Sequence, residues 1–143
     1  MSNIDKFNTI VLHVLVKLYD CFPVPATLDA AKIAVDALNA INPESEKPQV
    51  FEQEDILGRH TLNWLTQEGF ISVKQKTLTG SYFEVQLTLK GLTLLGYTLP
   101  TNESVTLIDQ AKDVLSGAVK DTAKDVLTKL FTTAASLTMT AMG

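Results

Sequence analysis

Several residue types on which large classes of protein depend are scarce in this 143-residue chain. Its one cysteine, Cys21, has no second cysteine with which to form an intrachain disulfide, and no leading segment has the pattern of a secretory signal. We therefore expect a protein of the reducing cytoplasm. The most apolar early stretch, residues 9–18, is interrupted by His13 and Lys17 and is much shorter than the ~20 residues that span a bilayer.

Motifs of catalysis and metal binding are also absent from the sequence. The two histidines, His13 and His60, lie in separate segments without evident partners for a metal site or for proton transfer. The chain has no glycine-rich phosphate loop, no His-Glu-x-x-His and no Gly-x-Ser-x-Gly. We expect no enzymatic activity, no cofactor and no bound metal.

Acidic residues outnumber basic ones by 16 to 12, which gives a net charge of -4 and a pI near 5.1. This balance differs from the basic composition of many nucleic-acid-binding domains. Any surface that attracts nucleic acid must therefore be local. The hydrophobic content of 45% suits one sizeable core with an appendage.

The stretch that ends at Gly69 has the clearest helical pattern in the chain. Leu57, Thr61, Trp64 and Leu65 fall on one side of a helix, so this side faces a core. We expect Trp64 to be buried between the first helix and a hairpin. Glycine follows the helix where a left-handed residue would end it. The opposite arc is polar and contains Arg59, His60, Asn63, Thr66 and Gln67.

After this helix the pattern changes from helical to alternating. Phe83, Val85, Leu87 and Leu89 are separated by polar residues, and a shorter strand-like run at residues 71–74 precedes them. Between the two runs, residues 79–81 supply a glycine-containing turn. We expect a two-stranded hairpin with these four apolar residues on one face.

Short motifs in this region are similar to those of a known superfamily. They are Leu62-x-x-Leu65-x-x-x-Gly69-Phe70-Ile71 at the helix end, Gly80 at the turn, and Leu87-Thr88-Leu89-Lys90-Gly91 after the second strand. Over residues 4–96 the chain resembles the winged helix-turn-helix superfamily, specifically bacterial MarR-like and PadR-like domains. The resemblance implies a mainly α fold with a small β-hairpin (α+β), with the winged-helix domain at residues 1–99. It also implies a transcription regulator that binds duplex DNA.

The polar arc and the hairpin then become the candidate DNA-binding surface. Arginine and asparagine on the arc have the donor and acceptor geometry to read guanine and adenine edges, and lysines in the hairpin can contact phosphate. The candidate residues are Arg59, His60, Asn63, Thr66, Gln67, Lys74 and Lys76. The alternative is that the arc is an ordinary solvated face, and that the winged helix is a protein-interaction module. Glu52, which shares the arc, counts against DNA binding.

The segments before this helix are also expected to be helical. Ser2 and Asp5 form a capping box for the first helix, whose apolar residues lie nearly all round and predict the most buried helix of the domain. Thr27 is expected to cap the second helix. Residues 42–48, with two prolines and mixed charge, predict a solvated loop that is longer than an ordinary helix-turn-helix connection.

Residues 100–143 differ in kind from the rest and form a predicted C-terminal tail. From residue 108 the apolar positions step by three, four and four, an eleven-residue period that predicts one long amphipathic helix at residues 104–135. The stripe contains Ile108, Leu115, Val119, Val126 and Leu130. Because MarR-like proteins commonly dimerise through terminal helices, the resemblance implies a homo-oligomer joined by this stripe.

Three other accounts of the tail remain open at this point. The helix packs against its own domain, or it binds a lipid surface, or its last ten or so residues are disordered. The eleven-residue period and the lysines resemble lipid-binding helices. However, bulky anchors are few and four aspartates offset four lysines, so a membrane surface is the less favoured partner.

Overall fold

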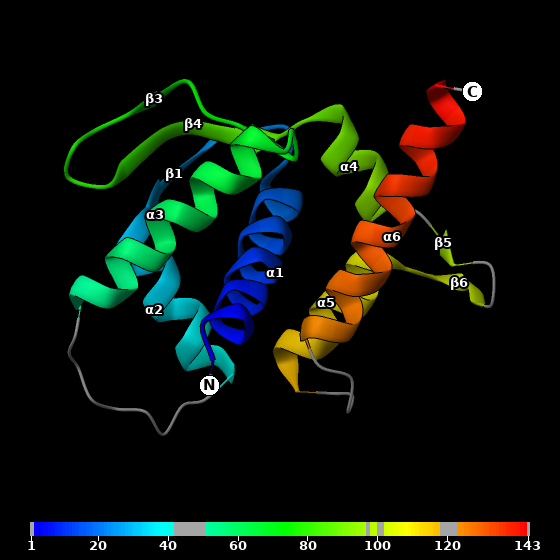
Figure 1. The fold of residues 1–143 in the computed structure, drawn as a ribbon, viewed down its shortest axis with the longest axis horizontal. Coiled ribbons are helices and arrows are strands. Elements are labelled where there is room, and N and C mark those ends of the chain that lie inside the picture. The colour runs from blue at the N-terminus through cyan, green and yellow to red at the C-terminus, as the bar shows by residue number, and fades with distance from the viewer. Residues whose placement is uncertain (1, 42–50, 97, 100–101, 118–122, 143) are drawn as a thin grey trace.

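Helix α1 (Asn3–Cys21) runs through the middle of the molecule, with α2 (Ala30–Ile41) and α3 (Phe51–Gln67) on one side and three further helices on the other (Figure 1). The Ser2 hydroxyl caps α1 by accepting a hydrogen bond from the Asp5 amide at 3.2 Å. The computed structural model describes residues 2–41, 51–96, 98–99, 102–117 and 123–142.

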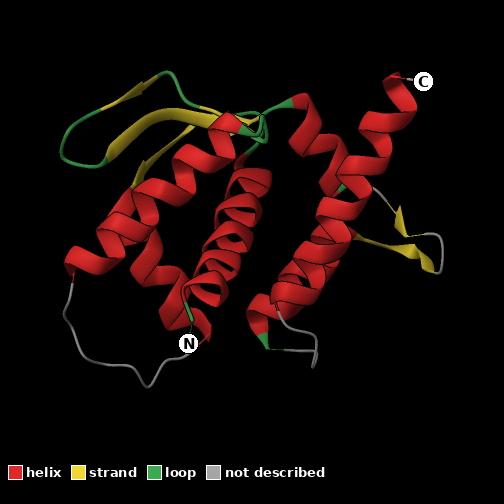
Figure 2. Ribbon diagram, viewed as in Figure 1, coloured by secondary structure: helices red, strands yellow, loops and turns green. Residues whose placement is uncertain are grey.

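The described part of the chain is mainly helical with a small antiparallel sheet, as predicted (Figure 2). The other elements are β1 (Ala26–Asp29), β2 (Ile71–Ser72), β3 (Gln75–Lys76), β4 (Ser81–Leu87), α4 (Leu89–Leu95), β5 (Thr98–Leu99), β6 (Asn102–Thr106), α5 (Leu107–Ser116) and α6 (Ala123–Met142). Among the described helices, none has the length and apolar character needed to cross a membrane.

Strand β4 is the centre of the sheet, and β1, β2 and β3 each pair with it antiparallel. Ala26 pairs with Val85 and Leu28 with Tyr82, so β4 contains one residue more than β1 between these pairs. This extra residue makes a β-bulge, where Glu84 adopts a φ of 51°. A bulge shifts the alternation of side chains between the two faces of a strand.

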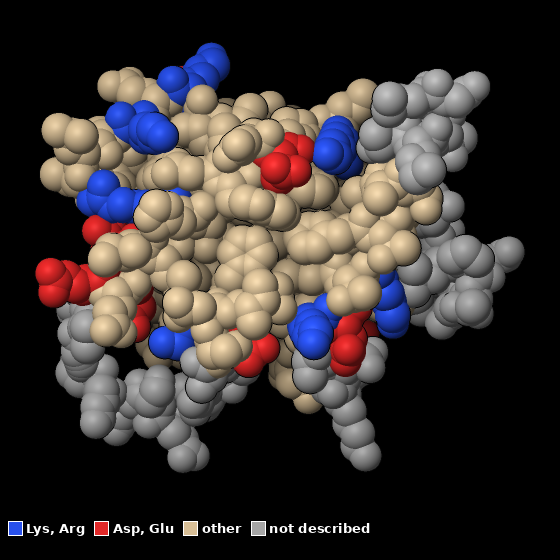
Figure 3. Space-filling view, in the orientation of Figure 1, with Lys and Arg blue, Asp and Glu red and all other residues tan. Residues whose placement is uncertain are grey.

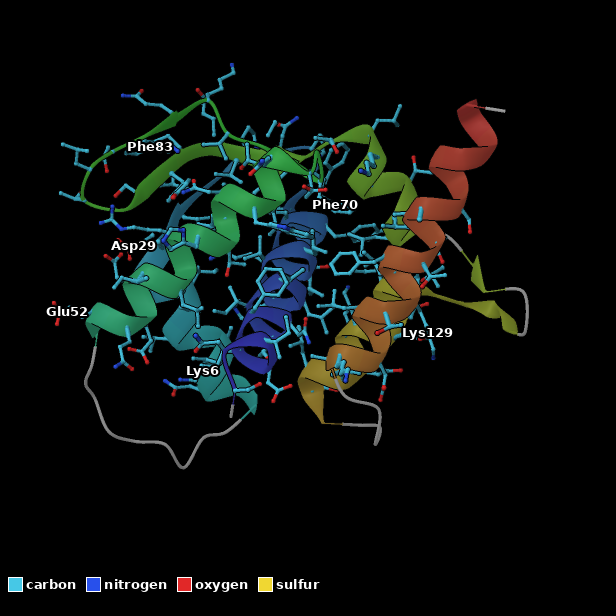
Figure 4. All side chains as sticks on the ribbon, viewed as in Figure 1. Lys6, Asp29, Glu52, Phe70, Phe83 and Lys129 are labelled. Carbon is cyan, nitrogen blue, oxygen red and sulfur yellow. The ribbon has the colours of Figure 1, made fainter. Side chains whose placement is uncertain are left out.

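The bulge corrects the predicted apolar face of the hairpin. Tyr82 and Val85 are both buried, and Phe83 (labelled in Figure 4) is 37% exposed. The expectation that Phe83 shares a buried face with Val85 and Leu87 is therefore wrong. The same expectation is wrong for Leu89, because this residue lies in α4 and is 79% exposed.

The second helix begins later than predicted. Thr27 does not cap it, because residues 26–29 form β1 and place Leu28 in the core opposite Tyr82. The Asp29 carboxylate instead accepts a hydrogen bond from the Lys32 amide at 2.9 Å, three residues on, in the manner of an N-cap. The predicted loop 42–48 lies outside the described residues.

Helices α2 and α3 meet at a buried glycine that sequence patterns did not single out. A Cβ added at Gly58 would overlap the carbonyl oxygen of Ala30 and would lie 2.8 Å from its carbonyl carbon. Only a residue without a side chain lets the two backbones approach this closely. Gly58 therefore determines how near α3 lies to the start of α2.

Trp64 joins the two sides of the molecule through an aromatic cluster. It is partly buried, and its ring centroid lies 5.2 Å from Phe7 of α1, 6.2 Å from Phe70 and 5.5 Å from Phe131 of α6. The predicted contact with the first helix is confirmed. The predicted full burial against the hairpin is wrong, because Trp64 is only partly buried and its other ring contacts are with Phe70, which precedes β2, and with Phe131 of α6.

The C-terminal tail forms two helices in place of the single one expected, so that expectation is wrong. Helix α5 begins with a capping box of Thr106 and Asp109, and it ends at Gly117, whose φ of 77° is left-handed. Residues 104–106, which were expected to be helical, belong to β6, which pairs with β5. Helix α6 continues to Met142, beyond the predicted end.

The predicted association stripe is largely buried within the chain itself. Ile108, Val126 and Leu130 are at most 4% exposed and belong to the same hydrophobic core as α1, with Leu115 packed against its edge. Val119 lies outside the described residues. The expectation that this stripe is free to bind a second subunit is therefore wrong for the described members, because they contact their own chain.

Candidate nucleic-acid interface

The hairpin of β3 and β4 is hydrogen-bonded to α3, so that these elements present one surface. Gly69 follows α3 with a φ of 83°, and Gly80 lies at the hairpin tip with a φ of 94°. Both turns were predicted at these positions, because left-handed backbone favours glycine. The Gly80 carbonyl accepts a hydrogen bond from the Ala30 amide at 2.9 Å, which ties the tip to α2 as well.

Arg59 fastens the hairpin tip to α3. Its Nε donates to both carboxylate oxygens of Asp55, at 3.0 and 2.9 Å, and its Nη1 donates to the Leu78 carbonyl at 2.8 Å. The hydrogen bond to Asp55 raises the pKa of Arg59, so the guanidinium is charged at any ordinary pH. A Cβ on Gly80 would lie only 3.1 Å from Arg59 Nη2, so glycine leaves room for this contact. Arg59 thus has internal partners and is not simply free to bind guanine.

Asn63 makes a second connection between α3 and the hairpin. Its Oδ1 accepts hydrogen bonds from the Tyr82 hydroxyl at 3.0 Å and from Lys76 Nζ at 3.3 Å. Burial raises the pKa of Tyr82, while the charge of Arg59 and the hydrogen bond to Asn63 oppose that shift, so the phenol stays protonated and donates. A bidentate contact with adenine needs both the oxygen and the nitrogen of the amide. The oxygen of Asn63 is already engaged.

The other predicted residues remain on the surface. His60 and Gln67 are exposed on α3, and the exposed Thr66 donates its hydroxyl to the Leu62 carbonyl one turn earlier, at 2.8 Å. Lys74 Nζ lies 3.9 Å from a Glu84 carboxylate oxygen in an exposed pair, which contributes little stability and leaves the ammonium accessible. Lys76 is exposed too.

Charge is divided unevenly over this surface. Figure 3 shows basic side chains gathered over the hairpin and acidic ones gathered below them, towards the N-terminal end of α3. The acidic side chains at this end of α3 include Glu52, Glu54 and Asp55. A polyanion would therefore be attracted at the hairpin and repelled at the start of α3.

Some residues of this surface were not in the predicted set. Asp55 precedes Arg59 by four residues, a spacing that brings side chains together on a helix, so this pair was accessible to sequence analysis. Tyr82 was not, because its inward position depends on the bulge. Lys90 was also omitted; its Nζ donates to the Glu68 carbonyl at 2.9 Å and lies 4.6 Å from the centre of the Phe70 ring.

Among the described residues, no group of three or more histidine, cysteine or acidic side chains is placed to hold a metal ion. No protein-family model, curated protein or solved structure matches the chain. Functional inference therefore rests on the geometry and charge of the α3–hairpin surface.

Proposed function

We propose that residues 3–95 form a winged helix-turn-helix domain that binds duplex DNA, with α3 facing the major groove and the hairpin of β3 and β4 as the wing. The order of elements supports this proposal, because helix, strand, two helices and an antiparallel hairpin follow one another along the chain. The observation that carries it is the pair of hydrogen-bonded connections, Arg59 to Leu78 and Tyr82 to Asn63, that join α3 and the basic hairpin into a single surface.

The contacts suggest different roles from those assigned by residue type alone. Arg59 and Asn63 hold the hairpin in position, whereas the exposed His60 and Gln67 remain available for base edges. Lysines of the hairpin contact phosphates, which contribute affinity without sequence information. Binding of this kind depends strongly on salt and discriminates weakly between sequences.

The test is fluorescence anisotropy of full-length protein with a random labelled duplex at a series of salt concentrations. Replacing Lys74 and Lys76 with alanine removes two phosphate contacts, which should lower the slope of log K against log salt by about 1.8, at about 0.9 per contact. Lys124→Ala with Lys129→Ala is the matched control, since it removes the same charge from α6 on the other side of the molecule (Figure 1). An absence of binding by the unaltered protein at ~50 mM salt, where electrostatic attraction is strong, would refute the proposal.

A protein-interaction module is the second candidate, favoured by large apolar side chains exposed on the hairpin and on α3. Leu78 at the hairpin tip is 96% exposed and Ile56 on α3 is 57% exposed. Exposed large apolar groups beside a charged rim are common where proteins meet. Failure of the DNA experiment would make this the leading candidate.

Self-association also remains a proposal. The described residues of the predicted stripe are buried in the monomer, so a homo-oligomer would have to use other surfaces. Light scattering by the full-length chain over a range of concentrations measures its mass in solution and decides between a monomer and an oligomer.

A further inference from the structure

A hollow of about 320 Å³ lies between the N-terminal turns of α1 and of α3, away from the hairpin. Among the described residues, those that line it are Asn3, Lys6, Gln53, Glu54, Ile56 and Leu57. The volume is at the lower end of the range for small-molecule sites, ~300 to 1,000 Å³. The lining combines two opposite charges with aliphatic side chains.

The two charged side chains of the hollow, Lys6 and Glu54, do not form an ion pair with each other. Glu54 Oε2 is buried and has no hydrogen-bond partner among the described residues. Lys6, labelled in Figure 4 at the N-terminal end of α1, makes no ion pair with Glu54 or with another described carboxylate. A buried carboxylate oxygen without a partner loses hydration without compensation, so such atoms call for an explanation.

We propose that this hollow binds a small zwitterion, an α-amino acid with an aliphatic side chain. The Lys6 ammonium binds the ligand carboxylate. The ligand ammonium donates to the Glu54 carboxylate, which must turn towards the hollow because its Oε2 is closed to solvent in the ligand-free protein. Ile56 and Leu57 contact the aliphatic part.

Ligands with a single charge fit the lining less well. A simple amine would leave Lys6 without a partner, and an anion such as phosphate would face the carboxylate of Glu54. An amino acid provides both complementary charges on adjacent atoms. This inference does not depend on DNA binding, since none of the residues that line the hollow is a candidate DNA-binding residue.

The experiment is a titration of ¹⁵N-labelled full-length protein at neutral pH with L-leucine, followed by amide chemical shifts. We expect shifts confined to residues lining the hollow. L-Leucinamide, which lacks the carboxylate and also stands for a peptide N-terminus, and 4-methylpentanoate, which lacks the ammonium, should each bind about tenfold more weakly or worse, since each loses a charge-assisted hydrogen bond.

Lys6→Met and Glu54→Gln keep the shape of the lining and should each weaken leucine binding by about tenfold or more. The matched controls are Lys17→Met in α1 and Glu68→Gln after α3, which change the same charges outside the lining and should leave binding unaltered. The spectra of the ligand-free variants show whether each fold is intact.

Three results would overturn the proposal. The first is an absence of shifts at about 10 mM leucine, a concentration above the millimolar dissociation constants of weak ligands. The second is leucinamide binding as well as leucine, which would indicate a site for amines or peptide N-termini. The third is undiminished leucine binding by a folded Glu54→Gln or Lys6→Met variant.

Discussion

Gly58→Ala tests the close approach of α2 and α3, on which the placement of α3 depends. At an open helix position this substitution stabilises a protein by roughly 1 kcal/mol, because alanine is the better helix former and restricts the unfolded chain. At Gly58 the new methyl group overlaps the Ala30 carbonyl. A backbone carbonyl cannot rotate away as a flexible side chain does, so the two helices must separate.

The size of the effect follows from these opposing terms. Overpacking of a tight interior costs about 1 to 3 kcal/mol. Because the new methyl group of Gly58→Ala meets backbone atoms, we expect its cost to lie towards the upper end of this range. Subtracting the helix-forming gain of roughly 1 kcal/mol leaves a net loss of about 1 to 2 kcal/mol. For a chain of this length, that corresponds to a fall in Tm of about 2 to 8 °C.

The assay is urea unfolding followed by circular dichroism, supported by thermal melts. His60→Ala is the control, because it changes an exposed residue two positions away in the same helix and should stay within about 0.5 kcal/mol of the unaltered protein. A Gly58→Ala protein that is as stable as the unaltered chain, or more stable, would show that α2 and α3 do not touch as described.

Three further substitutions test other parts of the molecule. Trp64→Ala removes the centre of the aromatic cluster and should cost about 3 kcal/mol in urea unfolding, so near-native stability would contradict this packing. Leu130→Ala should cost about 2 to 5 kcal/mol, with an unfolding midpoint independent of protein concentration; a concentration-dependent midpoint would instead indicate an intermolecular contact. Burial lowers the pKa of His13, so as pH falls below about 6.5 the unfolded chain binds a proton before the folded one does and stability is lost. His13→Gln should therefore lose less stability than the unaltered chain between pH 7 and pH 5, and equal losses would refute the role of burial.

Local sequence patterns were sufficient where one element determines its own structure. The helical spacing that ends at Leu65 and the left-handed Gly69 predicted α3 and its end, because periodicity and backbone sterics act within a few residues. Ser2 likewise marked the start of α1 through its side-chain hydrogen bond to the Asp5 amide.

The phase of β4 could not be predicted in the same way. Alternation of Phe83 with Val85 appears regular in sequence, yet the bulge at Glu84 turns Phe83 outwards. The bulge depends on pairing with β1, a strand some 55 residues earlier, at a place where the sequence pattern predicts the start of a helix. The error at Thr27 and the error at Phe83 therefore have one origin, the unrecognised pairing of β1 with β4.

The tail shows a limit of periodicity as evidence for a continuous helix. A glycine inside a helix costs only about 1 kcal/mol relative to alanine, so the eleven-residue period did not require a break at Gly117. An apolar stripe in the sequence also does not identify the surface against which it packs. The described stripe residues pack on the chain's own core, and the aromatic ring of Phe131 meets Trp64 across that contact.

The roles of the candidate DNA-binding residues depend on contacts between segments that lie apart in the sequence. Side-chain type identified Arg59 and Asn63 as suitable for bases, but it could not reveal that the hairpin returns to bind them. Once these two residues hold the hairpin, the exposed charge of the surface lies mainly in its lysines, and the start of α3 is acidic. Electrostatic attraction between exposed charges falls off within ~10 Å at moderate salt. If duplex DNA is the partner, the hairpin must therefore approach the phosphates first, and α3 must enter the groove with its acidic N-terminal turn directed away from the backbone.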